Sequence, residues 1–140
     1  MTLYAETSAV LRWLFAEDGG EEIRARLAAA TKVTTSRLTL IEIRRVVRRA
    51  EREARLDAAQ AADLLGVFAQ AASTWAILEI SDEVAHRSGE AFPIEPVRTL
   101  DAIHLASALF LRQALPDLSV LSSDERVRAN AKALGMGTCV

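Results

Sequence analysis

Four acidic residues stand where a carboxylate has chemical use. Glu6 and Asp124 each follow a short apolar run and precede a helix-forming segment, and Asp101 lies at the start of the very apolar stretch TLDAIHLASALFL. Glu42 shares a helical line with apolar residues four positions before and after it. A carboxylate beside buried apolar groups is costly unless it is paired or bound to a cation. These four positions therefore indicate a cluster with a function.

Carboxylates that converge without a cation repel one another and raise one another's pKa. Cys139 is the only cysteine and the two histidines, His86 and His104, are far apart, so a cysteine-based zinc cluster is excluded. Oxygen ligands alone match Mg²⁺ or Mn²⁺. Such ions generate a hydroxide nucleophile and neutralise charge on a phosphoryl group. The chemistry that this pattern predicts is metal-dependent phosphodiester hydrolysis.

Each acid also has a structural interpretation that the sequence leaves open. Glu6 and Asp124 suit helix N-caps, and Asp101 suits the first turn of a helix, where a negative charge complements the helix dipole. Glu42 could form an ion pair with Arg45 or Arg49 on the same side of a helix. His104 follows Asp101 by three positions, and we expect it to be a satisfied, partly buried histidine and not a catalytic base.

The elements that position these acids alternate between strands and helices. Strands are expected at residues 2–5, 32–36, 75–80, 118–123 and 138–140, and helices from Thr7, through Ile23 and Leu27, from Ser36 to Ala50, from Asp57 to Phe68, and at 82–90, 100–111 and 125–134. Thr7 or Ser8, then Ser36 and Ser81, suit N-caps. This alternation predicts an α/β domain with a parallel sheet covered on both faces. Its ligand site is expected beyond the carboxyl ends of the strands.

Length and composition limit the class of protein. The chain has 140 residues, 51% of them hydrophobic, and a formal net charge of −2. The length and composition favour one folded domain over residues 1–140. The small negative net charge gives no overall electrostatic attraction to nucleic acid. No apolar stretch is long enough to span a bilayer. We therefore expect a cytoplasmic protein, not a membrane protein, whose contact with nucleic acid depends on a local patch.

Four segments in this order and spacing resemble PIN-domain proteins, specifically the VapC-type toxins of bacterial toxin–antitoxin operons. They are YAETSAV at 4–10, SRLTLIEIRRVVRR at 36–49, TLDAIHLASAL at 99–109 and VLSSDERVRANAKALG at 120–135. The third segment is the most diagnostic, and the resemblance runs over essentially the whole chain.

The resemblance implies a three-layer α/β/α sandwich with a central parallel sheet of four to five strands. It also implies an endoribonuclease that uses Mg²⁺ or Mn²⁺ to activate water, a homodimer, and inhibition by a cognate VapB-like antitoxin. The acidic positions of the family fall on Glu6, Glu42, Asp101 and Asp124. Thr7 and Ser8 match the small hydroxyl residues after the first acid, and Ser123 would lie next to the site.

One position departs from the family's pattern, because the first acid is usually Asp and here it is Glu6. The extra methylene keeps the charge but moves the ligating oxygens by more than about an ångström, a scale to which catalytic geometry is sensitive. We expect metal binding and catalysis to survive. The alternative is a catalytically weakened PIN-fold module that binds protein or RNA. An aspartyl-nucleophile phosphatase is disfavoured, because such enzymes need a second Asp at position 8, which is Ser.

An arginine-rich segment follows Glu42. Six arginines lie between residues 44 and 55, and Arg45 and Arg49 are the ones expected near the acids. Their guanidinium groups could bind RNA phosphates or an acidic segment of the antitoxin. The run could equally form a solvated face paired with Glu51 and Glu53.

Overall fold

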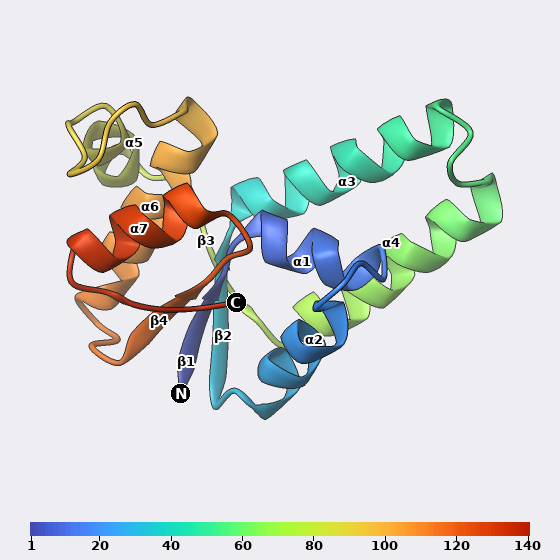
Figure 1. The fold of residues 1–140 in the computed structure, drawn as a ribbon, viewed down its shortest axis with the longest axis horizontal. Coiled ribbons are helices and arrows are strands. Elements are labelled where there is room, and N and C mark those ends of the chain that lie inside the picture. The colour runs from blue at the N-terminus through green and yellow to red at the C-terminus, as the bar shows by residue number, and fades with distance from the viewer.

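The computed structural model describes residues 1–140 as a parallel sheet with helices on both faces (Figure 1). The sheet has five strands in the order β3-β2-β1-β4-β5, and every pairing is parallel. The strands are β1 (Thr2–Ala5), β2 (Lys32–Ser36), β3 (Ala76–Leu78), β4 (Leu118–Leu121) and β5 (Gly137–Cys139). The predicted α/β/α sandwich is therefore confirmed, with five strands.

Seven helices cover the two faces of the sheet. They are α1 (Thr7–Leu14), α2 (Gly20–Ala29), α3 (Arg37–Arg52), α4 (Ala58–Ala72), α5 (Asp82–Ser88), α6 (Thr99–Arg112) and α7 (Glu125–Ala133). Helices α1 to α4 pack on one face, while α6 and α7 pack on the other and α5 packs against α6. Helices α3 and α4 form a long hairpin that extends beyond the sheet (Figure 1). None of the helices combines the length and the apolar character that a bilayer span requires.

The central strand β1 is buried on both faces. Leu3 and Ala5 belong to the apolar clusters under α1 to α4, whereas Tyr4 belongs to the cluster under α6 and α7. This division follows from the alternation of side chains along a strand. The residue that comes next, Glu6, thus emerges at the centre of the sheet's carboxyl edge.

Helix starts follow the capping pattern with two differences. Ser36 accepts a hydrogen bond from the Leu38 amide and caps α3, and Ser81 caps α5 in the same way, as expected. The expectation that Thr7 or Ser8 caps the first helix is wrong, because the N-cap of α1 is Glu6 itself. The second difference is that α6 begins at Thr99, one residue before the expected 100–111, and its N-cap residue Arg98 makes no capping hydrogen bond through its side chain.

Two strands are shorter than expected, and one of these is less buried. β3 covers three residues of the expected 75–80 and is partly exposed, not buried, because it is an edge strand bonded only to β2. β4 ends two residues earlier than expected, and β5 begins and ends one residue earlier. The early end of β4 leaves Ser122 and Ser123 in the turn that leads to Asp124.

The order of strands in the sheet changes direction at β1: the chain adds β2 and β3 on one side of it and β4 and β5 on the other. The crevice beyond the carboxyl ends of strands at such a switch point is the usual ligand site of open α/β sheets. Glu6 follows β1 and Asp124 follows β4, so the fold brings these two acids to that crevice.

Candidate active site

Glu6 is buried, with 4% of its surface exposed, and one of its two oxygens is fully engaged. Oε2 accepts hydrogen bonds from the Ser8 amide at 3.1 Å, from the Ser8 hydroxyl and from the Ser122 hydroxyl at 2.8 Å. Oε1 accepts no hydrogen bond and lies 3.9 Å from His104 Nε2. The N-cap interpretation is therefore correct for Glu6, yet it occupies only one oxygen.

Asp124 divides its oxygens in the same way. Oδ1 caps α7 by accepting from the amides of Arg126 at 2.8 Å and Val127 at 3.3 Å. Oδ2 takes no part in the cap and lies 3.4 Å from Arg98 Nη2. Each of these two acids is thus fixed by its helix while a second oxygen stays clear of the cap.

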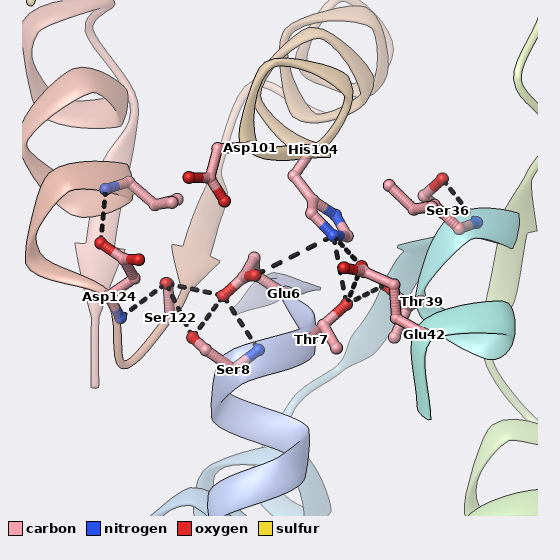
Figure 2. A network of polar contacts seen from close by, with 12 residues as sticks. Glu6, Thr7, Ser8, Ser36, Thr39, Glu42, Asp101, His104, Ser122 and Asp124 are labelled. Carbon is pink, nitrogen blue, oxygen red and sulfur yellow. Dashed lines mark hydrogen bonds and ion pairs between the residues drawn. The ribbon is translucent and has the colours of Figure 1, made fainter. Parts of the chain in front are cut away.

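Glu42 projects from α3 into a hydroxyl and imidazole network (Figure 2). Its Oε1 accepts from the Thr7 hydroxyl at 2.6 Å and contacts His104 Nε2 at 2.6 Å, while Oε2 has no partner in the chain. Burial raises the pKa of Glu42, but the hydrogen bond and charge of His104 and the hydrogen bond of Thr7 lower it, and the net pKa lies below its ordinary value. Glu42 is therefore held as a carboxylate.

His104 is buried and connects Glu42 with Tyr4. The Tyr4 hydroxyl lies 2.7 Å from His104 Nδ1. Burial, and after it the charge of Glu6, raises the pKa of Tyr4 well above its ordinary value, so the phenol keeps its proton. Because a carboxylate only accepts, His104 Nε2–H donates to Glu42, while Nδ1 pairs with the Tyr4 hydroxyl. His104 is satisfied, as expected, and it orients a site carboxylate.

Asp101 lies in the first turn of α6 and shares a cation with Asp124. Its Oδ2 lies 3.1 Å from Arg98 Nε, and its Oδ1 has no partner in the chain. Arg98 thus contacts one oxygen of each carboxylate. The hydrogen bond and charge of Asp101 raise the pKa of Arg98 above its ordinary value, with further contributions from Asp124 and Glu6.

A continuous series of contacts joins all four predicted acids at one edge of the sheet. Figure 2 shows the part that runs from Asp124 through Ser122, Glu6 and His104 to Glu42. Arg98 joins Asp101 to Asp124, and the Asp124 amide donates to the Ser122 hydroxyl, which donates to Glu6. His104 then lies between Glu6 and Glu42. The four carboxylates come from the starts of three different helices and from the second turn of α3.

The neighbours of the acids differ in part from those expected. Thr7 and Ser8 contact Glu42 and Glu6, respectively. Ser123 lies next to the site through its amide, which donates to the Ser8 hydroxyl at 3.0 Å, although its own hydroxyl is buried without a partner. Ser122, which the sequence did not single out, binds Glu6 directly. Tyr4 and Arg98 were also missed. The signal for Arg98 was its place three residues before Asp101, the spacing of an ion pair on a helix.

The arginines after Glu42 are mostly exposed and partly neutralised. Arg48 pairs with Glu51, and Arg49 pairs with Glu53. The expected alternative of an ion pair between Glu42 and Arg45 or Arg49 is therefore wrong. A shallow groove on the outer part of α3 is lined by Arg45, Val46, Arg48, Arg49 and Arg52. The solvated-face interpretation thus holds for the paired arginines, while Arg45 and Arg52 have no acidic partner.

Comparison with known proteins identifies the family. A family model described as "PIN domain" matches residues 3–134. The chain belongs to the PIN-domain family. Ribonuclease VapC46 of Mycobacterium tuberculosis is 31% identical over 134 residues, which cover 96% of this chain and 93% of VapC46. This PIN-domain protein is thus a member of the VapC family of ribonuclease toxins.

Solved structures share the PIN fold at low sequence identity. The VapBC2 complex of Rickettsia felis, bound to a DNA fragment from its promoter, has a TM-score of 0.67 at 14% identity, with 99% of this chain and 98% of that chain covered. VapC20 of Mycobacterium tuberculosis, described as a toxin that cleaves the sarcin–ricin loop, has a TM-score of 0.64 at 13% identity, with 91% and 93% covered. At these identities the likeness concerns the fold.

The carboxylates of this PIN domain suit a hard divalent cation in type, although not as a preformed cage. The structure contains no group of three or more His, Cys, Asp or Glu side chains arranged to hold a metal ion. However, Mg²⁺ keeps several waters and commonly binds through one or two carboxylates. Asp101 and Asp124 already share one cation, the guanidinium of Arg98. The residues present therefore fit a hydrated Mg²⁺ or Mn²⁺ between carboxylates.

Proposed function

We propose that this protein is a Mg²⁺- or Mn²⁺-dependent endoribonuclease toxin of a VapBC-type pair. One observation carries the proposal. Glu6, Glu42, Asp101 and Asp124 reach the switch point of the sheet, and each keeps one oxygen that accepts no hydrogen bond or only the exposed Arg98. A cation between such carboxylates relieves their repulsion. Membership of the ribonuclease VapC family supports the same reaction.

The chain's own residues hold the carboxylates in place. Ser8 and Ser122 orient Glu6, and Thr7 with His104 orients Glu42. The backbone of α7 fixes Asp124. A metal ion held by these acids would lower the pKa of water and neutralise charge on the scissile phosphate. Arg45 and Arg49, one and two turns beyond Glu42 on its side of α3, would contact RNA phosphates or an acidic antitoxin segment.

The same proposal includes the partners and the place of action. A VapB-like antitoxin is supported by the solved VapBC complex with the same fold, and a homodimer by the resemblance to VapC-type toxins. We propose that residues 1–140 act as one PIN-like unit on RNA in the cytoplasm. The match of the family model to residues 3–134 supports a single unit.

A second candidate function is a catalytically weakened PIN-fold module that binds protein or RNA. The lack of a preformed group of three metal ligands favours it, together with Glu6 at the usual position of Asp. In this candidate the longer side chain serves the cap of α1 and the bond to Ser122 in place of a metal ion. The two candidates differ in whether purified protein cleaves RNA.

A cleavage assay on purified protein separates the two candidates. The enzyme proposal predicts that RNA cleavage stops with EDTA and returns when Mg²⁺ or Mn²⁺ is added. It also predicts that Glu6→Asp changes kcat/KM by less than about tenfold, because Asp caps a helix equally well and coordinated waters take up the shorter reach. Cleavage that persists in EDTA contradicts metal dependence. Absent cleavage that Glu6→Asp restores supports the weakened module.

A further inference from the structure

Arg98 is the one arginine that contacts the acids of the candidate site. Its Nε lies 3.1 Å from Asp101 Oδ2, and its Nη2 lies 3.4 Å from Asp124 Oδ2. The residue precedes α6 as its N-cap residue, while Asp101 and Asp124 lie at the starts of α6 and α7. The guanidinium therefore bridges the first turns of two helices, in contact with both carboxylates.

The two carboxylates are mostly buried, whereas the guanidinium is mostly exposed. The side chains of Asp101 and Asp124 are 18% and 22% exposed, but that of Arg98 is 66% exposed. Asp124 is held by its cap on α7, and the Arg98 side chain makes no hydrogen bond except to these acids. An exposed ion pair of this kind is weak. Departure of Arg98 leaves the cap that holds Asp124 intact and frees Oδ2 of both carboxylates.

We propose that Arg98 is a displaceable counter-ion that exchanges partners during the reaction. In the cation-free site it neutralises Asp101 and Asp124; a divalent cation displaces it, and the freed guanidinium then binds a phosphate of the RNA. This inference rests on the proposed function, since it requires these two acids to bind the cation. A guanidinium and a metal ion repel each other, so they cannot share the same two oxygens at full strength.

The chemistry of arginine suits the second half of this exchange. A guanidinium carries five N–H donors in a planar fork that matches two phosphate oxygens. The backbone of Arg98 is tied to α6 through its carbonyl, which accepts from the Ala102 amide at 2.8 Å. The displaced side chain therefore stays at the edge of the site. A substrate phosphate that approaches the cation gives Arg98 a new anionic partner in place of the two carboxylates.

Mn²⁺ binding tests the first half of the exchange. Electron paramagnetic resonance titration without RNA should show that Arg98→Gln binds Mn²⁺ about fivefold more tightly than the unaltered protein, because the competing cation is gone. Arg24→Gln is the matched control, since Arg24 forms an exposed ion pair with Glu21 three residues away on α2. It should leave the affinity unchanged. An affinity of Arg98→Gln equal to or weaker than that of the unaltered protein overturns the proposal.

RNA binding tests the second half. With a fluorescent single-stranded RNA oligonucleotide and Ca²⁺ as the cation, Arg98→Gln should bind about tenfold more weakly, and Arg98→Lys should recover part of the loss. Equal RNA affinity in all three proteins also overturns the exchange. If the unaltered protein binds no Mn²⁺ and cleaves no RNA, the proposed function fails as well. If it binds Mn²⁺ and cleaves RNA but Arg98→Gln behaves like Arg24→Gln, this inference alone fails.

Discussion

Glu6 and Glu42 depend on hydroxyl and imidazole groups that come from distant parts of the chain. Tyr4 and His104 lie 100 residues apart in the sequence, and Ser122 and Glu6 lie 116 apart. The acids could be predicted, because each lies at the end of an apolar strand or within an apolar helix, where a carboxylate is costly without a partner. Their partners could not, because a serine or tyrosine carries no signal until the sheet brings it next to a carboxylate.

Replacement of His104 tests the buried network by itself. His104→Ala leaves Tyr4 and Glu42 without their common partner inside the protein, and unpaired buried polar groups cost about 1–3 kcal/mol each. We expect the free energy of unfolding in urea to fall by about 3 kcal/mol. His86→Ala is the control, because His86 pairs with Glu90 on the surface, and it should change stability by less than about 0.5 kcal/mol. Equal effects of the two substitutions would show that the network adds nothing.

At the scale of elements, helix starts place the site. α1, α6 and α7 begin at or next to Glu6, Asp101 and Asp124, so the same residues serve local structure and the candidate site. Capping patterns in the sequence revealed Ser36, Ser81 and the helix after Asp57, since caps depend on residues only two or three positions away. The exposure of β3 was not predictable in this way. It depends on which strand lies at the edge, and that is a property of the whole sheet.

Two substitutions of Asp124 distinguish its role as the N-cap of α7 from its role as a negative charge in the site. Asp124→Asn keeps an oxygen that caps α7, whereas Asp124→Ala removes it, so the alanine variant should be less stable by about 1 kcal/mol than the asparagine variant. RNA cleavage should fall about 100-fold or more in both, because the charge is lost.

The matched control for Asp124 is Asp57, which caps α4 in a capping box with Gln60. Asp57→Asn and Asp57→Ala should show the same difference in unfolding free energy with no change in cleavage. If cleavage falls only in Asp124→Ala, the cap and not the charge is what activity needs.

At the scale of the whole molecule, topology concentrates the acids without an excess of charge. The net charge is only −2, and the arginines of α3 are partly paired within their own helix. Alternation of strands and helices was enough to predict a parallel sheet of this class. It could not give the strand order, which depends on pairings between distant segments. That order puts β1 beside β4 and so creates the edge at which the acids meet.

The most direct test of the central claim is RNA cleavage by Asp101→Asn in the presence of Mg²⁺. Asp101 is the only acidic residue of α6, and Asn keeps its size while removing the negative charge. Asp63→Asn, on the exposed face of α4, is the matched control. We predict that Asp101→Asn reduces cleavage by about 100-fold or more while keeping the circular dichroism spectrum of the unaltered protein, and that Asp63→Asn cleaves normally. Undiminished cleavage by folded Asp101→Asn would contradict the site.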